Sequence, residues 1–237
     1  MNTNGQRLLL DLFCGAGGAG MGYYRAGFEV TGVDIAPQSH YPFEFVQGDA
    51  IEFCRQYGAR FDVIHASPPC QAYTGMRRIT LSRFGHAPEH PDLIPATRDA
   101  LIATGRPYVV ENVVGAPLLS PFLLCGASLG LPGLARHRLF ETNVMLPAPP
   151  RCAHLGNDLT IGVYGKRPDG RRLSYRKYRP SRAAKSLEEA QRVMGIEWMD
   201  WDEIRNAIPP VYTEWIGRHL RALLENERQS VAIGALP

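Results

Sequence analysis

The 237-residue sequence lacks the features of several large protein classes. Its five cysteines are odd in number and scattered, which argues against a disulfide framework and favours a reducing, cytoplasmic setting. No apolar run approaches the roughly 20 residues of a membrane span, and the first residues lack the plan of a signal peptide. With 45% hydrophobic and 21% charged residues, the chain fits one globular domain, or one domain with a small lobe.

Acidic residues are nearly absent from one short segment. Residues 166–182, the basic segment, hold eight Lys or Arg and one Asp, a net charge of +7. The rest of the chain has 18 basic and 22 acidic residues, so the overall charge of +3 comes from this segment. Its arginines stand beside Tyr175 and Tyr178, a mixture that suits a nucleic-acid backbone. A solvated Arg-rich loop would have the same composition.

Strand-like and helix-like stretches alternate in the first half of the chain, which predicts a doubly wound, mostly parallel α/β sheet with helices on both faces. The expected strands are 8–13, 28–35, 61–66 and 107–111, and the expected helices are 21–26 and 92–104. After residue 120 the pattern weakens. There we expect a strand at 159–164, a helix at 186–194 capped by Ser186, and a last helix at 211–226 before a frayed tail.

A glycine-rich turn follows the first expected strand. It contains G-x-G-x-x-G at Gly15, Gly17 and Gly20, a spacing that lets the backbone approach a ligand at a helix N-terminus. Asp34, at the end of the next strand, is placed to accept hydrogen bonds from ribose hydroxyls. Asp49, in a Gly-Asp pair at another strand end, suits an adenine amino group. The pattern fits NAD, FAD or S-adenosylmethionine.

Three further motifs carry groups able to do chemistry. Cys70 lies in SPPCQ and Glu111 in ENV, both at carboxyl ends of expected strands, where open α/β sheets bind ligands. Burial of Glu111 would raise its pKa and keep a proton on it at neutral pH. In RHR, Arg136 and Arg138 would share one face of a strand. Taken singly, these residues also fit a buried thiol, a capping carboxylate and an exposed edge strand.

Together the motifs resemble those of the DNA (cytosine-5) methyltransferase family. In the family's order they read FCGAG, Asp34, GD, PPCQ, ENV, RHR and NAIPP, and they span about residues 8 to 217. The compact arrangement is similar to methyltransferases of bacteriophages and their bacterial hosts. Two departures stand out: Arg205 occupies a position where the family usually has Gly, and the variable region is short.

The resemblance implies the Rossmann-like fold of S-adenosylmethionine-dependent methyltransferases. It implies a catalytic and cofactor-binding domain at 1–142, a shortened target-recognition lobe at 143–182 and C-terminal helices at 183–237. S-adenosylmethionine would be the cofactor and S-adenosylhomocysteine its product. The implied partner is double-stranded DNA, and no membrane association is expected. The protein would act as a monomer in the cytoplasm of a bacterial cell or phage-infected host. DNA methylation within restriction-modification would be the setting.

The resemblance also implies residue roles. Cys70 would attack C6 of a flipped-out cytosine, aided by a positive pocket that helps it ionise. Glu111 would protonate or hydrogen-bond N3, Arg138 would bind the O2 side, and Arg136 would support the site. The catalytic set is completed by Pro69, Gln71 and Asn112.

The cofactor and DNA sets follow from the same resemblance. The cofactor set is Phe13, Cys14, Gly15, Ala16, Gly17, Gly18, Asp34, Ile35, Asp49, Ala50, Pro68, Asn206 and Ala207. The DNA-binding set is Arg77, Arg78, Arg83, Lys166, Arg167, Arg171, Arg172, Arg176, Lys177 and Arg179. Cys152 and His154 are too few to hold zinc by themselves, so the sequence predicts no metal.

Other functions remain open at this point. The short lobe is compatible with a different cytosine substrate, such as tRNA or a free deoxycytidine nucleotide. A NAD(P)-dependent oxidoreductase would explain the glycine motif and Asp34 but leaves PPCQ, ENV and RHR unexplained. A catalytically silent nucleic-acid-binding module is a third class, in which Cys70 would have no chemical role.

Overall fold

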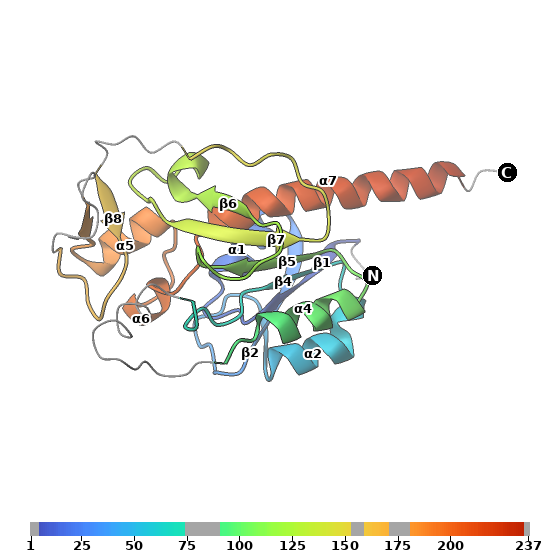
Figure 1. The fold of residues 1–237 in the computed structure, drawn as a ribbon, viewed down its shortest axis with the longest axis horizontal. Coiled ribbons are helices and arrows are strands. Elements are labelled where there is room, and N and C mark those ends of the chain that lie inside the picture. The colour runs from blue at the N-terminus through green and yellow to red at the C-terminus, as the bar shows by residue number, and fades with distance from the viewer. Residues whose placement is uncertain (1–4, 74–90, 153–158, 171–180, 235–237) are drawn as a thin grey trace.

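A seven-stranded sheet forms the centre of the molecule, in the order β3-β2-β1-β4-β5-β7-β6 (Figure 1). The computed structural model describes residues 5–73, 91–152, 159–170 and 181–234, with the side chains of the last helix described to Asn226. The strands are β1 (Arg7–Leu12), β2 (Phe28–Asp34), β3 (Glu44–Gln47), β4 (Val63–Ala66), β5 (Tyr108–Asn112), β6 (Phe122–Cys125) and β7 (His137–Thr142). Neighbours among β1 to β5 pair in parallel, and β7 is antiparallel to both β5 and β6. The predicted doubly wound, mostly parallel sheet is confirmed.

Helices cover both faces of this sheet. They are α1 (Gly18–Arg25) and α7 (Pro210–Gly234) on one face, and α2 (Ala50–Tyr57) and α4 (Ile94–Ala103) on the other (Figure 1). Successive strand residues point to opposite faces, so Leu9 joins the core under α1 and α7, while Leu10 joins the core under α2 and α4. Both side chains are fully buried, which explains why β1 is apolar along most of its length.

A third core lies at one end of the sheet (Figure 1). Its elements are β8 (Thr160–Gly162), β9 (Ser181–Ala183), α5 (Leu187–Met194) and α6 (Trp201–Ile204). The two strands pair in parallel and form a separate small sheet. The predicted Ser186 cap is confirmed, because its Oγ accepts a hydrogen bond from the Glu189 backbone N–H at 3.2 Å. The described part of the chain also contains two short 3₁₀ turns, η1 (Gly58–Arg60) and η2 (Gly126–Leu129).

The structure differs from the sequence predictions in several places. The last helix continues to Gly234, so the frayed tail expected from Ser230 onward was wrong for these residues; no glycine or proline interrupts positions 218–233. The RHR strand lies between β5 and β6, which removes the edge-strand alternative. The elements that the sequence analysis missed are α2, β6, β9 and α6, whereas β3 was expected only as a strand ending before Gly48. Within the described residues, no helix has the length and apolar character needed to cross a membrane.

Candidate active site

The glycine-rich turn joins β1 to α1 through a series of left-handed residues. Phe13, Gly15 and Gly17 have φ values of 57°, 48° and 84°. A side chain would strain the backbone at Gly15 and Gly17, whereas Phe13 adopts this conformation at a cost. Among the residues that the structure describes, nothing lies within 4 Å of the position that a Cβ of Gly15 would take, so these residues leave open space above the first glycine of the turn.

The C-terminal part of the chain packs directly on this turn. A Cβ on Gly18 would collide with the backbone carbonyl of Ile208, so glycine there permits contact with the chain that follows α6. The Trp198 indole Nε1–H donates a hydrogen bond to the Ala16 carbonyl at 2.8 Å. Ala207 also approaches Gly18. Asn206 is exposed and donates its amide to the Asp202 carbonyl at 2.9 Å.

Two carboxylates stand beside the glycine-rich turn, each with a structural role. Asp34 accepts hydrogen bonds from the backbone N–H of Gly15 and of Ala36, both at 3.0 Å, through different oxygens. Asp49 caps α2, accepting from two backbone N–H groups at 2.9 Å through Oδ1 alone. Next to Asp34, the apolar Ile35 is 73% exposed. Ala50 and Pro68 are buried. Within the turn, Cys14, Ala16 and Gly17 are also buried.

A buried acid that sequence reasoning missed lies beneath the turn. Asp11 is fully buried in β1, and its Oδ2 accepts from the Tyr41 hydroxyl at 3.3 Å. A Cβ on Gly20 would lie 2.8 Å from the same oxygen. Burial raises the pKa of Asp11 from 3.8 to about 8, outweighing the Tyr41 hydrogen bond. Its sequence signal is a polar residue inside an otherwise apolar strand.

We expect the substitution Asp11→Asn to change how stability depends on pH. The unfolded carboxyl ionises near 3.8, while the folded one retains its proton to about 8, so the folded state binds more protons in this window. The stability that Asp11 contributes in the wild type therefore falls as pH rises through this window. The variant has a neutral asparagine amide at this position, so its stability does not fall for this reason. Thermal unfolding at about pH 5 and about pH 9 should show the variant's advantage growing with pH. Asp99→Asn, an exposed change on α4, is the matched control; an advantage independent of pH would contradict the argument.

The loop after β4 presents Cys70 at the carboxyl edge of the sheet. Cys70 is half-buried, and its carbonyl accepts a hydrogen bond from Tyr73 N–H at 2.9 Å. The Asn112 side chain, buried at the end of β5, donates to the Pro68 carbonyl at 2.9 Å. This bond ties the neighbouring strand to the Pro-Pro turn. Pro69 and Gln71 are exposed on either side of Cys70.

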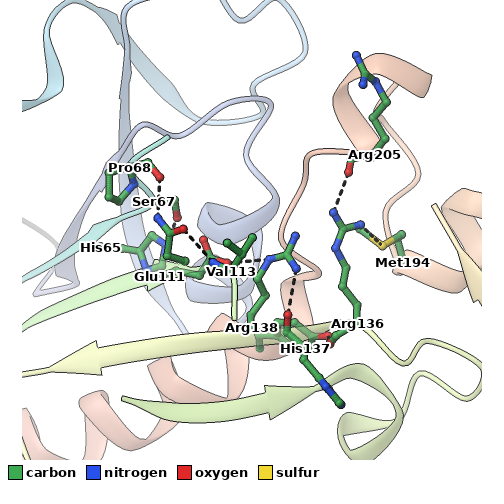
Figure 2. Close-up of polar contacts among 12 residues, drawn as sticks. His65, Ser67, Pro68, Glu111, Val113, Arg136, His137, Arg138, Met194 and Arg205 are labelled. Atoms are coloured by element: carbon green, nitrogen blue, oxygen red, sulfur yellow. Dashed lines mark hydrogen bonds and ion pairs between the residues drawn. The ribbon is translucent and has the colours of Figure 1, made fainter. Parts of the chain in front are cut away.

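Glu111 and Arg138 form a buried ion pair between β5 and β7 (Figure 2). Arg138 Nε lies 2.9 Å from Glu111 Oε1, and the two side chains are 13% and 7% exposed. The approach is not directed as a hydrogen bond, so Oε1 retains acceptor capacity. Burial nevertheless raises the pKa of Glu111 above its ordinary value, against the opposing effects of Arg138 and Arg136. The direction expected from the sequence is confirmed.

A chain of buried polar groups leads away from Glu111. Ser67 hydrogen-bonds to Glu111, His65 Nε2 lies 2.7 Å from Ser67 Oγ, and Tyr23 Oη lies 3.1 Å from His65 Nδ1. Burial lowers the pKa of His65 to about 3, so its ring is neutral. One tautomer satisfies every group: Tyr23 donates to Nδ1, Nε2–H donates to Ser67, and Ser67 donates to Glu111. Sequence reasoning missed this chain, whose only signal is a His two residues before SPPCQ.

Arg136 and Arg138 leave the same side of β7 but reach different partners (Figure 2). Arg136 is 3% exposed, and its Nη2 donates to the Arg205 carbonyl at 2.7 Å. Its Nη1 lies 3.4 Å from the sulfur of Met194. Arg136 therefore holds the C-terminal segment against β7. Burial lowers its pKa to about 10, which leaves the guanidinium charged at neutral pH.

Arg205 fits its position without the glycine that the resembled family usually has there. Its φ of −65° lies in the ordinary helical region, so no left-handed residue is required. Its Nε donates to Asp202 Oδ1 at 3.0 Å.

The electrostatics around Cys70 differ from the expectation of an ionised thiol. Arg138 and Arg136 do lower the pKa of Cys70, but burial raises it more, and Glu111 adds to the rise. The pKa of the thiol is therefore above its ordinary value. The positive pocket is real, yet it does not ionise Cys70 by itself, because the loop removes the sulfur from water.

Only two residues of the predicted DNA-binding set lie within the described chain. Lys166 and Arg167 are exposed between β8 and β9. The other predicted members fall outside the described residues: Arg77, Arg78, Arg83, Arg171, Arg172, Arg176, Lys177 and Arg179.

Comparisons with known proteins were made on sequence and on structure. No family model matches the chain, and no curated protein matches it. Among solved structures, it resembles a protein described as a DNA modification methyltransferase encoded within an E. coli prophage, at 15% identity and a TM-score of 0.58, covering 93% of this chain and 100% of that one. It also resembles the Entamoeba histolytica methyltransferase EhMeth, at 12% identity and TM-score 0.57, covering 92% and 99%.

A third structure has the same arrangement of elements. It is Spodoptera frugiperda DNMT2, at 15% identity and TM-score 0.55, covering 91% of this chain and 99% of that one. The fold is that of the S-adenosylmethionine-dependent methyltransferases. At such low identity the likeness concerns the fold, and the chemistry of this chain has to be argued from its own residues.

Proposed function

We propose that this protein transfers a methyl group from S-adenosylmethionine to C5 of cytosine in double-stranded DNA, through a covalent bond between Cys70 and C6. One observation carries the proposal. The half-buried Cys70, the buried Glu111 and the Arg138 guanidinium lie at the carboxyl edge of the sheet, with Arg138 Nε 2.9 Å from Glu111 Oε1. Arg138 lowers the pKa of Cys70 and Glu111 raises it, which supports a common site for the three groups.

The glycine-rich turn fits an adenosine-containing cofactor. There is open space above Gly15, the Asp34 carboxylate lies beside it, and the exposed Ile35 offers an apolar surface for a base. Asp49 keeps Oδ2 outside its capping bonds, so this atom is available to an adenine amino group. When bound, S-adenosylmethionine supplies the methyl group as an electrophile activated by its sulfonium.

The residues of the chain then have the following roles. The Cys70 thiol loses its proton and its sulfur bonds to C6, while Glu111 gives its proton to N3, so the ring carries no net negative charge. Arg138 leaves Glu111 for the O2 side of the base as that carboxyl is engaged. The methyl group bonds to C5 with the electron pair of the former C5=C6 double bond. Water then takes the proton from C5, and the electrons of that C5–H bond reform the double bond as the sulfur leaves with its own bonding pair. The N3 proton returns to Glu111.

Double-stranded DNA is favoured by the charge distribution. A cytosine inside a duplex must be flipped out of the stack to reach Cys70, at a cost of a few kcal/mol. The net +7 of the basic segment is suited to contacting phosphates, and Lys166 and Arg167 are exposed within it. The short lobe offers few base-edge contacts, so we expect a short recognition sequence or relaxed specificity.

The test is radiolabelled methyl transfer to duplex DNA, tRNA and dCMP in parallel, with calorimetric titration of S-adenosylhomocysteine and NADH. We expect turnover on DNA and binding of S-adenosylhomocysteine alone. Turnover on dCMP or tRNA without DNA would overturn the choice of substrate. Binding of NADH instead would overturn the reaction class. Bisulfite-type mapping of DNA from expressing cells would then report the sequence context.

We expect Asp34→Asn to weaken S-adenosylhomocysteine binding by about 10- to 100-fold, because hydrogen bonds to a charged acceptor contribute about 1.5–3 kcal/mol. The change also weakens the bond that positions Gly15 N–H. Isothermal titration measures the effect, with Asp99→Asn as control. Unchanged affinity would remove Asp34 from the cofactor site.

A further inference from the structure

A cluster of sulfur and imidazole ligands lies outside the candidate active site. Cys125 ends β6, His137 begins β7, and Cys152 lies in the chain that follows β7. One ligand atom of each residue lies within 4.8 Å of the others. The Cys152 sulfur is 3.4 Å from His137 Nε2. Three residues separated by up to 27 positions in the sequence therefore meet at one point.

The sheet itself brings two of the three together. Cys125 and His137 are direct partners in the antiparallel pairing of β6 and β7. Side chains of directly opposed residues project from the same face of the two strands, about 5 Å apart. Alternation along β7 then places His137 on the face opposite Arg136 and Arg138 (Figure 2). The cluster is thus separated from Glu111 by the sheet.

We propose that Cys125, His137 and Cys152 bind a zinc ion. In a tetrahedral zinc site, Zn–S bonds of about 2.3 Å and Zn–N bonds of about 2.0 Å place sulfur and nitrogen about 3.5 Å apart. The observed 3.4 Å separation matches this value. Two thiolates and an imidazole are the donor set that zinc prefers over magnesium or calcium. Cys125 is 1% exposed and Cys152 is exposed, so the ion would be bound at the rim of the sheet.

This proposal differs from the sequence expectation of no metal. That expectation counted Cys152 and His154 alone, whereas the fold supplies Cys125 and His137 from distant positions. His154 falls outside the described residues, and the three described ligands suffice for the proposal. Water or another side chain would complete the coordination.

The consequence of such a site is structural. The ion would join the end of β6, the start of β7 and the chain leading toward the basic segment. It would hold β7 where Arg136 and Arg138 emerge on the opposite face. Because the ion lies across the sheet from Glu111, it has no part in the proposed methyl transfer. Structural zinc contributes directly to folding free energy.

The experiment measures metal content in the full-length protein grown with added zinc. We expect about one zinc per chain by plasma mass spectrometry, and less than about one tenth in Cys152→Ser. Cobalt substituted for zinc should give strong tetrahedral ligand-field bands and thiolate charge-transfer absorption. Cys54→Ala is the matched control, since it removes a buried cysteine of α2 outside the cluster and should keep the zinc.

Several results would overturn the proposal. One is wild-type protein that contains no zinc and gives no tetrahedral cobalt spectrum. Another is zinc retained at full stoichiometry in both Cys152→Ser and His137→Ala. A Cys125–Cys152 disulfide in zinc-free protein, detected by mass spectrometry without reduction, would also overturn the proposal, because the disulfide would take the place of the metal. If Cys152→Ser fails to fold, treatment of the wild type with a mercurial thiol reagent still tests whether cysteine thiolates hold the zinc, because the reagent should then release it. Because no step needs substrate, failure of the methylation assay leaves this test intact.

Discussion

In Cys70→Ser, methyl transfer to duplex DNA should fall by at least about 10³-fold, because a serine hydroxyl at this position has no base to activate it. The same change should abolish covalent trapping on DNA that contains 5-fluorocytosine. There the wild-type sulfur stays bonded to C6, since fluorine cannot leave C5 as the proton does. Methyl-transfer rates and a denaturing gel measure the two effects.

The matched control for this prediction is Cys54→Ala. Cys54 is a buried thiol of α2, so its loss tests whether any cysteine change reduces activity through the fold. It should retain both turnover and trapping. If Cys70→Ser had no effect on any product, Cys70 would have no chemical role, as in a catalytically silent nucleic-acid-binding module.

Glu111→Gln should reduce kcat/KM by about 10²–10⁴-fold, the usual contribution of a general acid. Glutamine keeps the size of the side chain but has no proton to transfer to N3. It also leaves the Arg138 guanidinium facing a neutral group, where the wild type has an ion pair of 2.9 Å. Binding of S-adenosylhomocysteine should be unchanged, which separates lost chemistry from lost folding.

The pH profile gives this prediction its own signature. Wild-type kcat/KM should follow a bell-shaped pH profile, because the reaction needs the Cys70 thiol ionised and the Glu111 carboxyl protonated; burial raises both pKa values. Because the two groups interact electrostatically, the apparent pKa values of the two limbs belong to the pair of groups. Glu111→Gln should remove the alkaline limb and keep the acid limb. An unaltered bell-shaped profile in Glu111→Gln would mean that the alkaline limb comes from a residue other than Glu111.

Local chemistry accounts for what could be predicted from the sequence. The strand–turn–helix at residues 8–26 follows from apolar strand residues and left-handed glycines, and Ser186 followed by Glu189 marks a helix start. The meeting of Cys70 and Glu111 at one edge follows from parallel strands, whose carboxyl ends all lie on that edge.

Contacts between distant segments were beyond local reasoning. Nothing near Arg136 in the sequence indicates that it binds the Arg205 carbonyl, 69 residues away. The pairing of Cys125 with His137 depends on the register of two antiparallel strands, and β6 was not predicted. The Tyr23–His65–Ser67 chain likewise depends on α1 packing over β4.

The position of α7 has a consequence for biosynthesis. This helix supplies Ile216, Leu220 and Leu224 to the core that covers one face of β1, β2 and β4. A nascent chain that has completed every strand of the central sheet would still expose that apolar face to solvent until α7 has left the ribosome. The Ala16–Trp198 and Arg136–Arg205 bonds likewise need residues that follow the central sheet in the chain. Premature termination before α7 would thus leave this apolar face uncovered, and the fragment would be a target for chaperones and proteases.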